Sequence, residues 1–196
     1  MAKKKWKGSA LLAPLPPALI TCKNGDSANI LTVGWTGIIN SNPPKTYISV
    51  RPERFSHDLI RDTGCFVINL PTKSLVKATD YCGVKSGKDT DKFKDMSLSY
   101  SLAQETGCPM LNESPVSIEC KVYDVVSLGS HDMFLADILN VYVDEEIVDE
   151  NEKIRFDKAK LIAYAHGDYF ALGERLGRFG FSVMKKKTAA RKKNGK

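Results

Sequence analysis

The chain has 196 residues, of which 42% are hydrophobic, and a formal net charge of +6. This length suffices for one well-packed domain and is too short for two domains of ordinary size. Eleven Lys and Arg residues lie in the first seven and last twelve positions, and subtracting them from +6 leaves a body with a net charge of −5. The basic character therefore belongs to the two ends and does not indicate a nucleic-acid-binding domain.

The two ends are predicted to lie outside the domain. Residues 1–13 form a basic N-terminal arm, residues 14–184 form the domain, and residues 185–196 form a basic, disordered tail. Runs of like charge repel one another and usually remain solvated, so solubility is the favoured role for both ends. Binding to nucleic acid or to an anionic membrane is the alternative, and steep salt-dependent binding would indicate it.

The start of the chain and the pattern of cysteines both favour a cytoplasmic location. Pro14, Pro16 and Pro17 interrupt the start of the chain, which lacks the apolar core of a secretory signal. No apolar run of about 18 residues is long enough to span a membrane. The five cysteines lack a C-x-x-C pair, which argues against a disulfide framework and against a metal site. Each is interpreted as a small buried hydrophobic residue: Cys22, Cys65, Cys82, Cys108 and Cys120.

Strands dominate the first part of the domain in chain order. They are predicted at residues 18–23, 28–40, 45–50 and 65–71. The first two are joined at Asn24-Gly25, the dipeptide most typical of tight hairpins. A short helix precedes the fourth strand and ends at Gly64. That fourth strand is continuously apolar, which predicts burial on both of its faces.

The second part begins with a predicted helix at residues 74–82, capped by Ser74, and a loop at residues 83–93. Strands follow at residues 97–104, 116–122 and 133–145, with Gly129 as the turn between the last two, and residues 161–183 close the domain. This order lacks the regular βαβ alternation of a doubly wound fold. It predicts a mainly β, small antiparallel barrel with short accessory helices, whose side chains fill the interior and leave ligands to a groove or a subunit interface.

The stretch SVRPERFSHDLIRDTG places Arg51, Arg54 and Ser56 where this first helix begins. A helix start offers unpaired backbone N–H groups and partial positive charge, which suit a phosphate when a hydroxyl and a guanidinium lie beside them. Solvated arginines on an ordinary surface are the alternative interpretation of the same residues.

The stretch TVGWTG in the preceding strand contains Gly34 and Gly37 on either side of Trp35. Glycine weakens a strand and often marks close approach by a ligand or another backbone. A flat heteroaromatic ring against this backbone would explain the pattern, and a bulge with a buried tryptophan explains it equally well.

Six segments, in order, resemble the flavin reductase-like, flavoredoxin-type family of FMN-binding split barrels. They are NILTVGWTGIINSNPP, SVRPERFSHDLIRDTGCFVINLP, SGKDTDKF, ESPVSIECKV, GSHDMFLADI and LGRFGFSV, and the likeness runs from about Pro16 to Met184. The resemblance implies a Greek-key split barrel and a homodimer with FMN at or near the subunit interface. It also implies redox chemistry carried out by the flavin.

Carried over residue by residue, the resemblance implies two groups of FMN contacts. The isoalloxazine ring would lie against Thr32, Val33, Gly34, Trp35 and Thr36. The ribityl chain and phosphate would lie near Ser49, Val50, Arg51, Phe55, Ser56 and His57. Asp89 and Lys92 match a loop that borders the flavin in the family, where Lys92 would neutralise the phosphate from outside; a solvated loop is the alternative.

His131 is the candidate residue on the substrate side. The segment GSHDMFLAD is similar to a family motif, G-D-H-x-x-x-x-G, that lies beside the nicotinamide of a reduced pyridine nucleotide. Ser130 and Ala136 depart from it, which puts nicotinamide use in doubt. A strand histidine bonded to the main chain is the alternative. His166 and Tyr169 are weaker candidates for the same pocket.

The resemblance implies an FMN-dependent oxidoreductase, an NAD(P)H-dependent flavin or ferric-type reductase. A non-catalytic electron carrier that exchanges electrons with protein partners is the alternative, and a flavin-binding module docked to nucleic acid is a third interpretation. Because the cofactor performs the electron chemistry, no single acid or base is expected to be indispensable. No G-x-G-x-x-G loop is present, so NADH or NADPH would bind in the open groove over the flavin.

Overall fold

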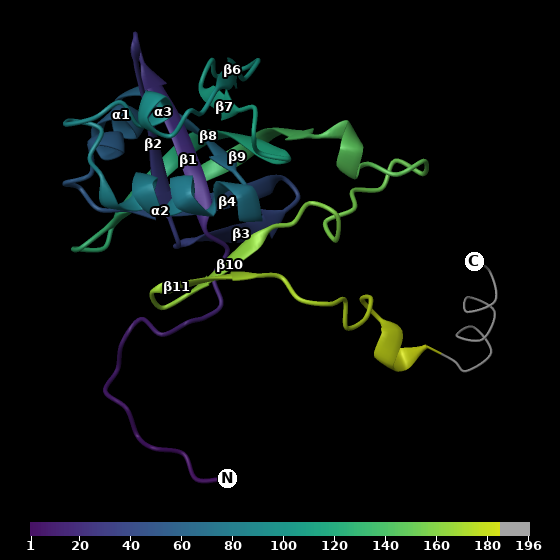
Figure 1. The fold of residues 1–196 in the computed structure, drawn as a ribbon. Helices are drawn as coiled ribbons and strands as arrows, with labels where there is room; N and C mark the ends of the chain where they lie inside the picture. Colours follow the sequence, from purple (N-terminus) through teal and green to yellow (C-terminus); the bar gives the residue numbers. More distant parts are fainter. Residues whose placement is uncertain (185–196) are drawn as a thin grey trace.

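The computed structural model describes residues 1–184, which contain one seven-stranded antiparallel sheet with the strand order β2-β1-β5-β8-β9-β4-β3 (Figure 1). Its strands are β1 (Ala18–Asn24), β2 (Ser27–Val33), β3 (Thr36–Ser41), β4 (Pro44–Val50), β5 (Cys65–Asn69), β8 (Val116–Ser127) and β9 (Asp132–Val143). Two small hairpins are β6 (Tyr100–Leu102) with β7 (Pro109–Leu111), and β10 (Ile162–Ala165) with β11 (Asp168–Ala171). The α-helices are α1 (Phe55–Thr63), α2 (Val76–Val84) and α3 (Lys92–Asp95).

The sheet is curled because β2 and β3 lie at its opposite edges although only Gly34 and Trp35 separate them in the chain. A two-residue link cannot cross a flat sheet of seven strands, since strands lie about 4.8 Å apart. The backbone N–H of Ser49 in β4 donates to the carbonyl of Trp35 (2.9 Å), which holds the link against β4. No strand pairing joins β2 to β3 or β4 within residues 1–184, so the barrel remains open along this line, which we call the seam. The predicted mainly β split barrel with short helices is confirmed.

The predicted single strand over residues 28–40 is wrong. Gly34 and Trp35 leave the sheet and divide this segment into β2 and β3, which pair with different neighbours. The predicted cap at Ser74 is also wrong. A 3-10 turn over Lys73–Leu75 leads directly into α2, so Ser74 lies inside a continuous helical run and its hydroxyl pairs with that of Thr72 (2.8 Å).

Two turn predictions are confirmed. The hairpin at Asn24-Gly25 joins β1 to β2, with Gly25 at a φ of +58°. Gly64 ends α1 in the left-handed conformation at a φ of +66°, and its N–H donates to the Ile60 carbonyl (2.8 Å). A residue with a Cβ is disfavoured in that conformation, which explains why glycine stands at both positions.

Buried side chains fill both sides of the sheet. The interior of the curl holds Ile20, Ile48, Phe66 and Phe134, each 0% exposed, and α1 adds Ile60 to this cluster. On the opposite face of β1 and β2, α2, α3 and β7 form a second apolar cluster that includes Leu19 and Ile30. The continuously apolar strand β5 is buried on both faces, as predicted.

The β6–β7 hairpin packs through β7 against β1 and β5, and the buried carboxylate of Glu119 in β8 anchors the loop between its strands. Glu119 is 0% exposed and accepts hydrogen bonds from the backbone N–H groups of Glu105 (2.9 Å) and Thr106 (2.7 Å). The side chains of Thr106, Asn140 and Tyr142 donate to it as well. Burial by itself would raise the pKa of Glu119, but these hydrogen bonds together hold it below its usual value.

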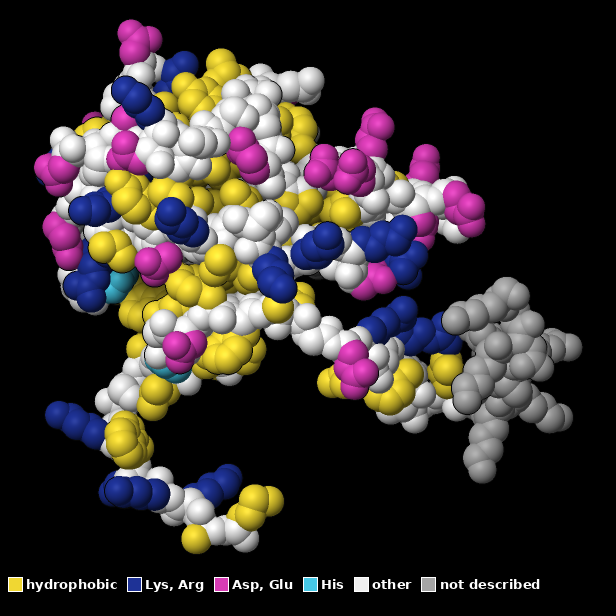
Figure 2. Space-filling model, viewed as in Figure 1, with side chains coloured by type: hydrophobic (Ala, Val, Ile, Leu, Met, Phe, Trp, Pro, Cys, Tyr) yellow, Lys and Arg dark blue, Asp and Glu magenta, His cyan; other side chains and the backbone are white. Residues whose placement is uncertain are grey.

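The two ends of the described chain lie away from the sheet (Figure 1). Residues 1–13 are exposed and form no regular secondary structure. In Figure 2 their lysines stand apart from the body, where both signs of charge are mixed. The predicted basic tail, residues 185–196, lies outside the described residues. Within residues 1–184, no helix combines the length and the apolar character needed to cross a membrane.

Replacing Glu119 with Gln should destabilise the protein at neutral pH by about 2–3 kcal/mol, because the amide cannot accept every bond that the charged carboxylate accepts. Since the folded pKa lies below the unfolded value of about 4.3, the carboxylate contributes stability above that value and loses it as the pH falls through the folded pKa. The unfolding free energies of Glu119→Gln and wild type, measured in urea, should therefore differ above the unfolded pKa and converge only once the pH falls below the lowered folded pKa. The exposed control Glu150→Gln should match wild type throughout, and a Glu119→Gln deficit that persists in acid would contradict this account.

Candidate functional site

Two adjoining cavities open at the seam. The first, which we call the cationic cavity, has a volume of about 370 Å³ and the second, the aromatic cavity, about 350 Å³. Leu31, Arg51 and Arg54 line both, so the two form one elongated site. The cationic cavity is also lined by Asn29, Glu53, Phe55, Ser56, Lys85, Ser86, Gly87 and Lys92. The aromatic cavity is also lined by Leu15, Thr32, Val33, Gly34, Trp35, Ser49, Val50, His131 and Tyr164.

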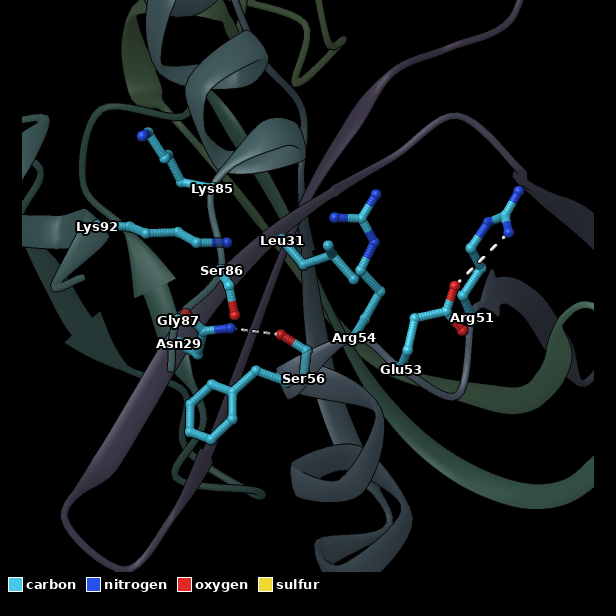
Figure 3. A pocket seen from close by; sticks show the side chains of 11 residues that line it. Asn29, Leu31, Arg51, Glu53, Arg54, Ser56, Lys85, Ser86, Gly87 and Lys92 are labelled. Carbon is cyan, nitrogen blue, oxygen red and sulfur yellow. Dashed lines mark hydrogen bonds and ion pairs between the residues drawn. The ribbon is translucent and has the colours of Figure 1, made fainter. Parts of the chain in front are cut away.

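Positive charge dominates the cationic cavity. Four cationic side chains, Arg51, Arg54, Lys85 and Lys92, face a single carboxylate, Glu53, which is paired with Arg51 (3.6 Å). In Figure 3, Lys92 and Arg54 reach into the cavity from opposite sides, while Arg51 turns toward Glu53. The start of α1 lines the same cavity at Phe55 and Ser56. This arrangement suits an anion such as a phosphate.

Lys92 is a buried ammonium rather than a residue of a solvated loop. It begins α3 and is only 3% exposed, and its Nζ donates to the carbonyls of Ile30 (2.8 Å) and Cys82 (3.0 Å). Burial lowers the pKa of Lys92, and nearby Cys82 opposes that shift. An ammonium has three donors, so two of them fix the side chain and the third is available to a ligand in the cavity. The expectation that Lys92 lies outside is corrected accordingly.

Gly87 allows the loop after α2 to approach β2 and α1 closely. A Cβ on Gly87 would lie 2.3 Å from Oδ1 of Asn29 and 2.7 Å from the ring of Phe55. The amide of Asn29 donates to the hydroxyl of Ser56 (2.7 Å), a contact drawn in Figure 3. Because Asn29 and Phe55 leave no room for a side chain, only glycine lets this loop approach them so closely.

The aromatic cavity combines exposed backbone with two rings. Trp35 is 41% exposed, and its ring lies 4.5 Å from that of His131, between centroids, at 38°. Nδ1 of His131 lies 2.9 Å from the hydroxyl of Ser130. Burial, together with the positive charges of Arg51 and Arg54, lowers the pKa of His131, so its imidazole is neutral at pH 7. The cavity therefore offers planar apolar surfaces beside main-chain polar groups, which suits a flat heterocycle.

Most of the predicted site residues line these two cavities: Thr32, Val33, Gly34, Trp35, Ser49, Val50, Arg51, Phe55, Ser56, Lys92 and His131. Thr36 instead donates its hydroxyl to the Tyr47 carbonyl (2.7 Å). His57 is 4% exposed, and its Nε2 lies 2.8 Å from the carboxylate of Asp132 in β9. Asp89 lines a neighbouring cavity that also borders Lys92.

The two weaker candidates lie near the aromatic cavity but not in it. Tyr169 lines an adjacent cavity of about 270 Å³, and its ring lies 5.3 Å from that of Tyr164. His166 is exposed at the turn between β10 and β11, with a φ of +44°. Of this hairpin, only Tyr164 lines the aromatic cavity itself.

Several lining residues were not predicted from the sequence. Asn29 lies in the middle of a strand, and Leu15 and Tyr164 meet only through a bridge between segments distant in the chain (2.8 and 2.9 Å). No local pattern indicates such contacts. A weak signal did exist for Ser86 and Gly87, because successive backbone N–H groups in a loop turn can form an anion-binding concavity.

Comparison with known proteins identifies the family. The model described as "Flavin reductase like domain" matches residues 11–173. The chain belongs to the flavin reductase-like family. It is similar to the flavoredoxin of Desulfovibrio vulgaris (Miyazaki F), with a TM-score of 0.87 and 28% identity over 93% of this chain and all of the other. For the flavoredoxin from Methanosarcina acetivorans the TM-score is 0.83 with 26% identity and the same coverage of both chains. An uncharacterized protein of Pyrococcus abyssi is 29% identical over 71% of this chain and 80% of its own.

Membership of this family makes the protein a flavin-associated redox protein of split-barrel fold. Both cavities lie within the matched residues 11–173.

Replacing Lys92 with Met should destabilise the protein by about 2 kcal/mol, because the buried carbonyls of Ile30 and Cys82 lose their donor. Urea unfolding followed by circular dichroism measures this change. The control Lys88→Met removes an exposed lysine from the same loop and should leave stability unchanged within about 0.5 kcal/mol. Equal effects of the two variants would show that the ammonium contacts do not hold α3 in place.

Proposed function

We propose that the protein is an FMN-binding oxidoreductase that accepts electrons from NADH or NADPH, a flavin or ferric-type reductase. The observation that carries this proposal is the pairing of a cationic cavity with an aromatic cavity in one continuous site at the seam. FMN has a phosphate at one end and a planar tricyclic ring at the other. The family membership of the chain supports a flavin as the ligand.

The residues fit FMN in a defined direction. Arg54, Lys92 and the start of α1 at Ser56 would hold the phosphate, with Asn29 orienting the Ser56 hydroxyl. The end of β2 around Gly34, together with Trp35, would hold the ring. Gly87 packs against Asn29 and Phe55 at the phosphate end, where an added side chain would collide with both. FMN supplies the chemistry of hydride acceptance and electron transfer when bound.

The protein's own residues bind and orient rather than transfer protons. His131 is neutral at pH 7 and its ring packs against that of Trp35. It therefore offers a polar, uncharged edge to a nicotinamide or another planar substrate that lies over the isoalloxazine ring. Ser130 fixes the orientation of that imidazole through Nδ1. The buried pair of His57 and Asp132 ties α1 to the first residue of β9, immediately after His131. His57 therefore helps to fix the backbone next to His131 through its bond to Asp132.

An electron carrier is the second candidate function. The similarity to two flavoredoxins favours it, since the name of those proteins denotes a flavin-containing redox protein. In this case the bound flavin would exchange electrons with a protein partner, and pyridine nucleotide would not reduce it.

The visible absorption spectrum of the purified, FMN-loaded protein separates these functions. We expect a flavin spectrum that bleaches without oxygen on addition of NADH or NADPH. Bleaching by dithionite alone would instead support the electron carrier. A wild-type protein that cannot be loaded with FMN would overturn both candidates.

Gly87→Ala locates the site in the same experiment. The added methyl should weaken FMN binding at least about tenfold, because it collides with Asn29 and Phe55 beside the phosphate end. The control Gly173→Ala adds a methyl where nothing lies within 4 Å and should bind FMN as wild type does. Unchanged affinity in a folded Gly87→Ala variant would exclude the cationic cavity as the phosphate site.

We further propose that two copies associate through exposed apolar side chains of β3, β8 and β9. Exposed apolar side chains on these strands are Ile38 (67%), Ile39 (46%), Tyr123 (47%), Val125 (42%), Leu139 (38%) and Val141 (50%). Clusters of exposed apolar residues favour association. A second copy is the proposed occupant because the family resemblance implies a homodimer with the flavin near its interface.

Sedimentation velocity tests the dimer. The wild type is expected to sediment as a dimer, and Ile38→Glu should shift it toward the monomer, since a charge on β3 would have to be buried. The control Leu172→Glu changes an apolar residue of similar exposure (58%) outside these strands and should leave the dimer intact. A monomeric wild type would contradict the proposal.

A further inference from the structure

Two cysteines that are far apart in the sequence meet on the outer face of the sheet. Cys65 is the first residue of β5, and Cys108 directly precedes β7 in the hairpin that covers this strand. Their sulfur atoms lie 3.2 Å apart although 43 positions separate the residues. Neither residue lines the two cavities at the seam, so the pair is independent of the flavin proposal.

The two thiols differ in access and in acidity. Cys65 is half-buried, whereas Cys108 is 1% exposed. The hydrogen bond from Cys108 lowers the pKa of Cys65 against the effect of burial, and Thr63 and the charge of Lys121 assist. Lys121 is the residue directly opposite Cys65 in β8. The bond with Cys65 and burial raise the pKa of Cys108. This is the asymmetry of an attacking thiolate and a resolving thiol.

The loop that carries Cys108 is held firmly over Cys65. The backbone N–H of Cys108 donates to the hydroxyl of Thr106 (3.2 Å), and the carbonyl of Cys108 accepts from the N–H of Ala103 (3.0 Å). Thr106 is in turn bound to the buried carboxylate of Glu119. The sulfur atoms need to approach by only about 1.2 Å to reach the disulfide bond length of about 2.0 Å.

We propose that Cys65 and Cys108 form a reactive dithiol site that is oxidised by small disulfides to an intramolecular disulfide. The other cysteines lack this environment. Cys22, Cys82 and Cys120 are buried at 0% exposure, and burial raises the pKa of each of them.

The reaction consists of two exchange steps with a low-molecular-weight disulfide, RSSR. The thiolate of Cys65 attacks one sulfur of RSSR, forming a Cys65–SR bond and releasing one thiolate RS⁻. Cys108 then loses its proton and attacks the sulfur of Cys65, which forms the Cys65–Cys108 bond and releases the second RS⁻. Two electrons pass from the protein to RSSR, which leaves as two thiols once the released protons are taken up.

The disulfide would join the β6–β7 hairpin covalently to β5 across a 43-residue separation. A crosslink over a segment of this length restricts the unfolded chain substantially and stabilises the fold. The oxidised protein should therefore unfold at a higher urea concentration than the reduced protein. The site couples the stability of this outer layer to the thiol–disulfide state of its surroundings.

The test uses the full-length protein, reduced, freed from reductant and incubated without oxygen with oxidised glutathione. Free thiols counted after denaturation should fall from five to three per chain, and peptide mapping should recover one Cys65–Cys108 crosslink. Cys108→Ala should stop at one glutathione bound to Cys65. Cys65→Ala should leave Cys108 reduced over the same period, and Cys82→Ala should still form the crosslink.

Three results would overturn the proposal: five thiols that persist in the oxidised wild type, a crosslink to another cysteine, or glutathione bound equally at all cysteines. The wild-type mapping decides the matter even if a variant fails to fold. Glutathione should also label Cys65 in the folded Cys108→Ala protein at least about tenfold faster than it labels Cys82, since Cys65 stays half-buried whereas Cys82 is 0% exposed and burial raises the pKa of its thiol.

Discussion

The two-residue link between β2 and β3 is the constraint on which the rest of this structure depends. Because β2 and β3 occupy opposite edges of the sheet, Gly34 and Trp35 force those edges together. The bond from Ser49 to Trp35 extends the pairing of β4 with β3 by one residue, and within residues 1–184 no ladder joins β2 to either of them. Both cavities lie at the opening that results. The site is therefore a consequence of incomplete closure: a fully paired barrel would bury the main-chain groups of this edge and leave its ligand no backbone to contact.

Buried polar groups attach the outer layer to the curled sheet. Asn69 in β5 donates to the Leu19 carbonyl (2.9 Å) and accepts from the N–H of Leu111 (3.0 Å), so it joins three segments. Glu119 holds the loop of the β6–β7 hairpin in the same way, and Lys92 holds α3. Burying each of these polar groups costs free energy unless its hydrogen bonds are made, and each makes several. Because those bonds form only in one arrangement, they specify the position of each segment more strictly than apolar packing does. Lys92 serves the site as well as the fold, and Glu119 holds in place the loop that carries Cys108.

The charge of the site is opposite to that of the body that surrounds it. The body carries a net negative charge, and the lysines of the N-terminal arm stand away from it (Figure 2). The cationic cavity nevertheless gathers four basic side chains around one carboxylate. Low-dielectric walls strengthen this local field, so the cavity attracts an anion although the surrounding surface does not. The same field acts on His131, where Arg51 and Arg54 help to keep the imidazole neutral.

Local sequence determined the features that depend on a few neighbouring residues. Gly64 and the Asn24-Gly25 dipeptide specify their turns, because only particular residues tolerate those backbone angles. The alternating and continuous apolar runs specify strands, and the resemblance of six segments to a known family brought most lining residues of the site together. The division of residues 28–40 into two strands was decided by tertiary structure, since the two halves pair with β1 and β4 at opposite edges of the sheet. Tertiary structure alone also determined the burial of Lys92 between two carbonyls, the fit of Gly87 against Asn29, and the meeting of Cys65 with Cys108. These contacts join segments between 10 and 62 residues apart, and no local propensity encodes such distances.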